Sequence, residues 1–89
     1  MNEVDVTVVN RLGLHARAAA KFVHLAGSFV SRVTVARAGT RVDGKSILGL
    51  LTLAASKGTR LHLSIQGDDE DEAGAQLAAL VRSRFGEDA

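Results

Sequence analysis

The sequence predicts an α+β open-faced sandwich, in which a four-stranded antiparallel sheet carries three helices on one face. Two observations lead to this fold class. The expected elements follow the order βαββαβα, and the strands are apolar on one face only, as in antiparallel sheets with one solvated side. Hydrophobic residues make up 46% of the 89-residue chain. That content suffices for one buried core, so we expect a single domain over residues 1–89.

Four segments alternate between apolar and polar residues, which is the period of a half-buried strand. The first covers residues 4–8, where valines alternate with an aspartate and a threonine. The second and third, at 32–35 and 40–42, are joined by a tight turn at Ala38-Gly39. The fourth covers residues 60–66.

Three segments have the period of helices that bury one face. The first covers residues 16–26, and Gly27 is expected to cap its C-terminus. The second is short, covering about 47–53, with Ser46 as its N-cap. The third begins at the acidic run 68–72, whose negative charges suit a helix N-terminus better than a calcium site.

Composition excludes several function classes. A net charge of +1 and an aromatic content of 3% argue against nucleic-acid binding. The sequence has no secretory signal and no apolar run near the roughly 20 residues that span a bilayer, so we expect a cytoplasmic protein without membrane insertion. No metal site is expected from His15, His24 and His62, because no ligand spacing recurs and His62 faces solvent on a strand.

His15 lies where a loop meets the first helix. The first amides of a helix have no internal hydrogen-bond partner and the macrodipole is positive there, so anion binding is favoured at this position. The same field favours a neutral, nucleophilic ring. Arg17 adds a guanidinium fork that suits phosphate oxygens. Position alone leaves two interpretations open, a phosphoryl acceptor and an ordinary helix cap.

Two sequence blocks resemble a known family. Gly-Leu-His-Ala-Arg at 13–17, followed by Ala-Ala-Lys-Phe-Val at 19–23, closely resembles the active-site signature of HPr, the histidine-containing phosphocarrier of the phosphoenolpyruvate-dependent phosphotransferase system. Gly-Lys-Ser-Ile-Leu-Gly-Leu-Leu at 44–51 resembles the regulatory serine region of HPr. One departure is Ala18, where HPr proteins commonly have proline; alanine is a good helix former and preserves the helix.

The resemblance implies a relay. His15 would accept a phosphoryl group on Nδ1 from phosphorylated enzyme I and pass it to a histidine of an enzyme IIA-type domain, with Arg17 stabilising the transferring group. The protein would be a stoichiometric carrier rather than an enzyme, and we expect a monomer. It would need no cofactor, because its phosphoryl donor is another protein. Sugar uptake and a nitrogen-regulatory branch both use such carriers, and the sequence leaves that choice open.

Ser46 has two interpretations. It is a good N-cap, which needs no further reason. The resemblance adds regulatory phosphorylation by HPr kinase/phosphorylase, which would place about two negative charges beside a docking surface.

Apolar side chains surround the short helix almost completely, although a helix on a sheet buries only one face. We expect Leu50 and Leu53 to point inward. The remaining three are expected to form an exposed patch near His15: Ile47, Leu48 and Leu51. The alternative is a more deeply buried helix with no exposed patch. The resemblance to HPr favours the patch and implies that it docks enzyme I and IIA domains. A modest basic rim for acidic partners is expected from Arg17, Lys21, His24 and Lys45.

Two alternatives compete with the carrier. Residues 39–46, Gly-Thr-Arg-Val-Asp-Gly-Lys-Ser, match the P-loop pattern of nucleotide-binding proteins. Size argues against it, because such domains need a larger, mostly parallel sheet, and Val42 continues a strand where the phosphate cradle is a loop. The other alternative is a binding module in which His15 carries no phosphate.

Overall fold

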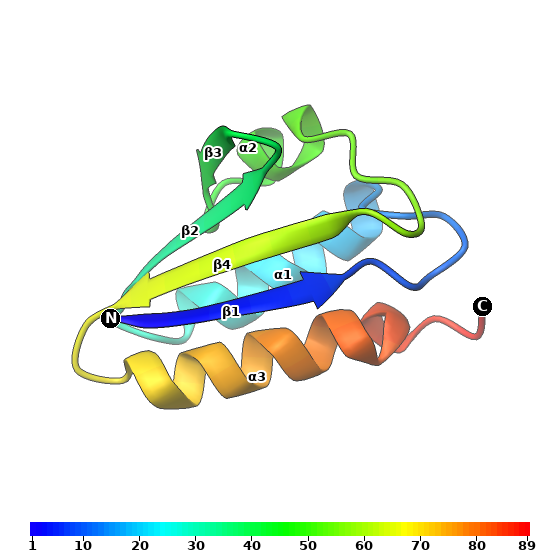
Figure 1. The fold of residues 1–89 in the computed structure, drawn as a ribbon. Helices are drawn as coiled ribbons and strands as arrows, with labels where there is room; N and C mark the ends of the chain where they lie inside the picture. Colours follow the sequence, from blue (N-terminus) through cyan, green and yellow to red (C-terminus); the bar gives the residue numbers. More distant parts are fainter.

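The computed structural model describes residues 1–89 and confirms the order βαββαβα (Figure 1). The strands are β1 (Asn2–Thr7), β2 (Arg32–Arg37), β3 (Thr40–Asp43) and β4 (Arg60–Gln66), and the helices are α1 (Ala16–Gly27), α2 (Ile47–Thr52) and α3 (Glu70–Arg82). A 3-10 turn follows at Arg84–Gly86. None of the helices has the length and hydrophobicity required to span a bilayer.

The four strands form one antiparallel sheet in the order β1-β4-β2-β3. Helices α1 and α3 lie along one face, and α2 packs between α1 and β3 (Figure 1). On the central strand, Leu63 pairs with Val4 of β1 and Val35 of β2. Its side chain points into a single core of 21 buried apolar residues. The predicted open-faced sandwich is therefore confirmed.

Two predicted boundaries are wrong. Gly27 is the last residue of α1 rather than its cap, which is Ser28 in a right-handed conformation with φ −78°. The chain therefore leaves α1 without the left-handed residue that makes glycine favourable at helix ends. Val8 lies outside β1, but its side chain stays buried and its N–H donates to the carbonyl of Thr59 at 2.9 Å.

One residue of the acidic run 68–72, Asp69, connects the start of α3 to the loop between α1 and β2 through hydrogen bonds. Asp69 occupies the N-cap position of α3 but makes no side-chain bond to that helix. Its carboxylate instead accepts hydrogen bonds from the N–H groups of Val30 and Ser31, both at 3.0 Å, and from the Ser31 hydroxyl. These bonds, the Ser31 hydroxyl first, lower the pKa of Asp69 below its ordinary value.

This carboxylate is expected to make stability depend on pH. A group with a lowered pKa contributes stability above its unfolded value of 3.8 and loses that contribution as pH falls through the folded pKa. The difference in unfolding free energy between wild type and Asp69→Asn should be largest near neutrality and shrink in acid. Denaturant unfolding from about pH 6 to about pH 2 measures it. Asp68→Asn is the control, and a difference that stays constant across this range contradicts the assignment.

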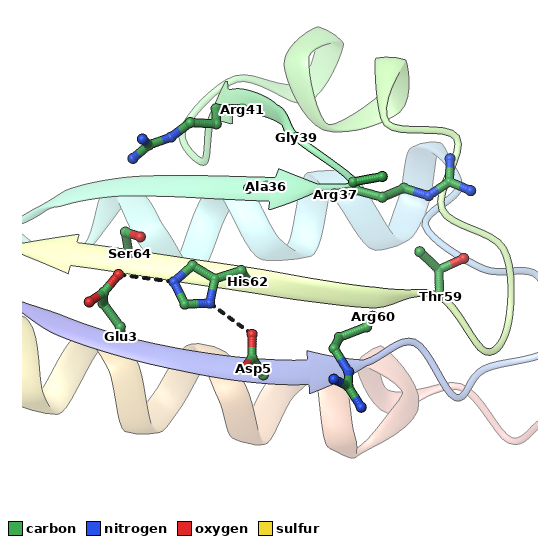
Figure 2. A pocket seen from close by; sticks show the side chains of 11 residues that line it. Glu3, Asp5, Ala36, Arg37, Gly39, Arg41, Thr59, Arg60, His62 and Ser64 are labelled. Carbon is green, nitrogen blue, oxygen red and sulfur yellow. Dashed lines mark hydrogen bonds and ion pairs between the residues drawn. The ribbon is translucent and has the colours of Figure 1, made fainter.

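The open face of the sheet carries the predicted exposed histidine, His62 of β4 (Figure 2). Its Nδ1 lies 2.7 Å from a carboxylate oxygen of Asp5, and its Nε2 lies 3.0 Å from one of Glu3. Hydrogen bonds to Glu3 and then Asp5 raise the pKa of His62. Since both ring nitrogens face carboxylates, His62 belongs to an acidic cluster on the face opposite the helices.

Candidate functional site

His15 is the N-cap residue of α1, with an extended backbone at φ −83° and ψ 179°. Its side chain makes no capping hydrogen bond, so His15 caps the helix by its position and backbone alone. The first intrahelical bond runs from the N–H of Ala19 to the carbonyl of His15 at 2.8 Å. The three amides before it, at 16–18, make no hydrogen bond within the protein. They leave a positive helix end directly after the histidine.

The loop before His15 is fixed by a close approach between two backbone segments. Gly13 has φ +70°, and a Cβ atom there would lie 2.6 Å from the carbonyl oxygen of Ala55. The N–H of Leu14 donates to that same carbonyl at 2.8 Å. Only glycine satisfies both the left-handed conformation and the contact. This anchoring fixes where the His15 backbone enters the helix.

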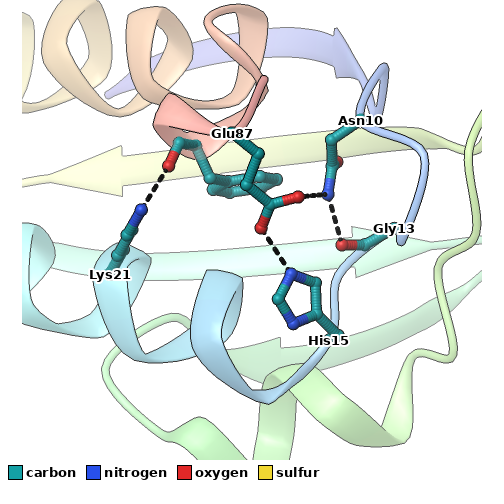
Figure 3. Close-up of polar contacts among 6 residues, drawn as sticks. Asn10, Gly13, His15, Lys21 and Glu87 are labelled. Carbon is teal, nitrogen blue, oxygen red and sulfur yellow. Dashed lines mark hydrogen bonds and ion pairs between the residues drawn. The ribbon is translucent and has the colours of Figure 1, made fainter. Parts of the chain in front are cut away.

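A chain of polar contacts holds the His15 ring (Figure 3). The ring Nε2 contacts carboxylate oxygen Oε2 of Glu87, 72 residues away in sequence. The other carboxylate oxygen, Oε1, accepts from Asn10 Nδ2 at 3.0 Å, and the same Nδ2 donates to the Gly13 carbonyl at 2.7 Å. The bond to His15, followed by that from Asn10, lowers the pKa of Glu87. The other ring nitrogen, Nδ1, has no hydrogen bond within the protein.

Residues 84–89, which we call the tail, bring Glu87 to the site. The Phe85 side chain is fully buried, and Arg84 and Phe85 both have left-handed backbones, with φ 61° and 53°. Lys21 Nζ donates to the Phe85 carbonyl at 2.7 Å, and the N–H of Arg11 donates to the carbonyl of Ala89 at 3.1 Å. The tail is thereby fixed across the N-terminal end of α1.

A surface hollow of about 380 Å³ lies beside His15, between the loop, α1 and the tail. Arg11, Arg17 and Lys21 supply positive charge to its lining, and Glu87 and Asp88 supply negative charge. Arg17 is exposed and makes no side-chain hydrogen bond, so its guanidinium is available to an anion at His15. Sequence reasoning identified Arg17 but missed Asn10, Arg11 and the tail.

The two lysines of the predicted basic rim are each hydrogen-bonded to a backbone carbonyl. Lys21 donates to Phe85, as described above, and Lys45 Nζ donates to the carbonyl of Phe29 at 2.8 Å. His24 is exposed and makes no side-chain hydrogen bond or salt bridge within the protein. Arg17 and His24 are therefore the members of the rim whose side chains are free of protein hydrogen bonds.

Helix α2 and its C-cap, Leu53, divide their apolar residues as predicted except at Leu51. Leu50 and Leu53 are buried, whereas Ile47 and Leu48 are 41% and 77% exposed. Leu51 is half-buried and packs against the core. We call Ile47, Leu48 and Leu51 the apolar patch. Since α2 packs against α1, the patch lies on the helix next to the one that begins at His15.

Ser46 is the N-cap of α2, as predicted. Its Oγ accepts a hydrogen bond from the N–H of Gly49 at 3.0 Å, and the side chain is partly exposed. A Cβ atom on Gly49 would lie 3.2 Å from this Oγ. The small residue at 49 therefore leaves room for the capping hydroxyl.

The P-loop alternative is wrong. Residues Thr40–Asp43 form strand β3, with Val42 paired to Val35 of β2. The amides that would bind phosphates are already occupied, because Gly44 N–H donates to the Val33 carbonyl and Lys45 N–H to the Asp43 carboxylate. Residues 39–46 therefore match the P-loop pattern in sequence but lack the free backbone N–H donors that bind phosphate in a P-loop.

Known proteins share both the sequence and the fold. The family model described as the PTS HPr component phosphorylation site matches residues 2–83. The phosphocarrier protein HPr of Cupriavidus necator is 52% identical over 87 residues, which cover 98% of each chain. The crystal structure of HPr-C-His from Thermoanaerobacter tengcongensis has a TM-score of 0.96, with 44% identity and complete coverage of both chains. That of an HPr dimer from the same organism has a TM-score of 0.78, with 45% identity, covering 98% of this chain and 100% of the other. The chain therefore belongs to the HPr family, the phosphocarrier proteins of the phosphotransferase system.

Proposed function

We propose that residues 1–89 act as one carrier domain in which Nδ1 of His15 takes a phosphoryl group from phosphorylated enzyme I and delivers it to an enzyme IIA-type domain. One observation carries the proposal. His15 is the N-cap of α1 with its Nε2 engaged by Glu87, while Nδ1 has no partner and the first three helix amides beside it are free. This arrangement suits a ring that attacks phosphorus through Nδ1 next to a positive helix end.

The chemistry is an exchange of nitrogen–phosphorus bonds. As His15 Nδ1 bonds to phosphorus, the bond between phosphorus and the donor histidine breaks, and its electron pair returns to the donor ring. In-line transfer of this kind demands positioning and charge stabilisation above all. The anchored loop supplies the first, and the helix amides with Arg17 supply the second. No cofactor takes part, because the phosphoryl group arrives on the donor protein.

The test is incubation with enzyme I and phosphoenolpyruvate, followed by intact mass measurement. We expect a gain of one acid-labile phosphoryl group, which is lost again when an IIA-type domain is added. No gain with active enzyme I contradicts the carrier function and favours the binding module. An acid-stable gain also contradicts it, since phosphohistidine is acid-labile.

Arg17 is expected to stabilise the transferring group. Arg17→Ala should slow phosphorylation of His15 by about 100-fold, the order of loss seen when one preorganised donor to a developing charge is removed. Arg17→Lys should recover part of the rate, because it keeps the charge but not the planar fork. Rapid-quench kinetics with phosphorylated enzyme I provide the measurement. Equal rates for Arg17→Ala and Arg32→Ala, an exposed arginine of β2, contradict this role.

We place the docking of enzyme I and IIA domains on the apolar patch, with Lys45 and His24 at its edge. The exposed Leu48 supports this placement, since exposed leucines on a short helix favour a contact surface. Leu48→Glu should weaken binding of enzyme I by about tenfold or more, the effect of a moderate interface residue.

Titration calorimetry with enzyme I measures this binding. Val30→Glu is the matched control, because Val30 is 78% exposed, like Leu48 at 77%, but follows the other end of α1. Equal affinities for the two variants contradict the docking surface.

Ser46 is proposed as a regulatory phosphorylation site for HPr kinase/phosphorylase. Its partly exposed hydroxyl directly precedes the apolar patch, so a phosphate would add charge where partners dock. Phosphorylation by that kinase should be lost in Ser46→Ala and, in wild type, should weaken enzyme I binding.

We also propose that the carrier works as a cytoplasmic monomer. Several related structures are dimers, so the oligomeric state is worth measuring. Light scattering during gel filtration should give the mass of one chain.

A further inference from the structure

We propose that Glu87 is a positioning residue for phosphoryl transfer: it holds the His15 proton on Nε2 and so keeps the Nδ1 lone pair free to attack. This inference rests on the proposed carrier function. A carboxylate only accepts hydrogen bonds, so the ring nitrogen facing it must be the one that bears the proton. Glu87 Oε2 faces Nε2, which leaves Nδ1 as the unprotonated nitrogen of the neutral ring.

The alternative tautomer is unreactive at the required atom. When the proton sits on Nδ1, that nitrogen has no lone pair to form a bond with phosphorus. During transfer, the Nδ1–phosphorus bond forms, the donor's nitrogen–phosphorus bond breaks, and the Nε2 proton stays in place. The hydrogen bond to Glu87 is therefore compatible with the ring both before and after phosphorylation.

The orientation of Glu87 is fixed by a second hydrogen bond. Asn10 is fully buried, and its Nδ2 donates to both Glu87 Oε1 and the Gly13 carbonyl. Turning the amide over would place Asn10 Oδ1 against two acceptor oxygens, so the orientation shown in Figure 3 is enforced. Asn10 Oδ1 is itself buried without a partner. Asn10 and His15 therefore both donate hydrogen bonds to the Glu87 carboxylate, one to each oxygen.

The substitution Glu87→Gln distinguishes control of the His15 tautomer from a purely structural role of Glu87. Asn10 still presents a donor, so the glutamine oxygen would face Asn10 and its NH2 group would face His15. That group donates to Nε2 and favours the proton on Nδ1, which is the unreactive tautomer. A similar amide substitution in the Ser-His-Asp triad imposes the wrong tautomer on its histidine. If Glu87 only fastens the tail, the isosteric glutamine should preserve function better than alanine.

The experiment compares wild type, Glu87→Ala, Glu87→Gln and Glu72→Gln, whose glutamate is exposed in the first turn of α3, at the end opposite the tail. Two measurements are made on each: the rate of phosphorylation by phosphorylated enzyme I, and the tautomer of the neutral His15 ring from its nitrogen NMR shifts at alkaline pH. Thermal unfolding verifies that each variant is folded.

We expect wild type and Glu72→Gln to hold the proton on Nε2. Glu87→Ala should show both tautomers and react about tenfold more slowly, the lower end of the loss seen when a metal-binding histidine loses its hydrogen-bonded orienting partner. Glu87→Gln should favour the proton on Nδ1 and be slower still. A wild-type ring protonated on Nδ1, a glutamine variant as fast as wild type, or an alanine variant faster than wild type overturns the proposal. If wild type gains no phosphate, the carrier function fails, while the tautomer measurement still decides the role of Glu87.

Discussion

Replacement of His15 by alanine is expected to abolish uptake of a phosphoryl group from enzyme I and to leave the fold intact. The side chain is the proposed acceptor. The other two histidines do not lie at the start of a helix, since His24 is in the last turn of α1 and His62 is on β4. The His15 side chain is 27% exposed and makes no capping bond, and its one side-chain hydrogen bond is to Glu87 of the tail, so its removal should leave the fold intact at the cost of that one contact. Mass measurement reports the phosphate, and thermal unfolding reports the fold.

The matched control is His62→Ala. His62 lies on the open face, with both nitrogens facing carboxylates, and its variant should take up phosphate as wild type does. An acid-labile phosphate on His15→Ala, or its loss from a folded His62→Ala, contradicts the assignment.

The largest expected loss of stability follows Phe85→Ala. Phe85 is fully buried in the core, and truncating such a phenylalanine costs about 3–5 kcal/mol through lost burial and the cavity left behind. That is a large share of the stability of a small domain, about 5–15 kcal/mol. Denaturant unfolding measures the change.

This substitution should also release the tail and move Glu87 away from His15, so transfer should slow at least as much as in Glu87→Ala. Phe85→Leu keeps most of the apolar volume and should cost much less. A Phe85→Ala variant as stable as Phe85→Leu shows that the tail is not anchored by this side chain.

Local patterns predicted most of the fold because each element buries one face against a single sheet. The fourth strand was predicted at 60–66 and forms over Arg60–Gln66; the first helix was predicted at 16–26 and forms over Ala16–Gly27. Helix ends were harder to predict. Gly27 has the residue type of a left-handed cap, but the conformation of the cap depends on the direction in which the chain leaves the helix, which tertiary packing decides.

Only the part of the site formed by residues close together in the sequence was predictable. A loop followed by a helix places His15 and Arg17 at a positive helix end, and that much follows from nearby residues. Glu87 reaches His15 across 72 positions because Phe85 enters the core and the chain turns through three consecutive left-handed residues, 84–86. No spacing or periodicity encodes that contact. The P-loop pattern shows the converse failure, a local match without the function. Its residues fit the pattern, but its amides already donate hydrogen bonds within the sheet and the following turn.

The most direct measurement is NMR of the nitrogen-labelled chain after phosphorylation by enzyme I and phosphoenolpyruvate. The account predicts a one-bond coupling between phosphorus and Nδ1 of His15, with the proton retained on Nε2 beside Glu87. Coupling to Nε2, or phosphate on any residue other than His15, would contradict it.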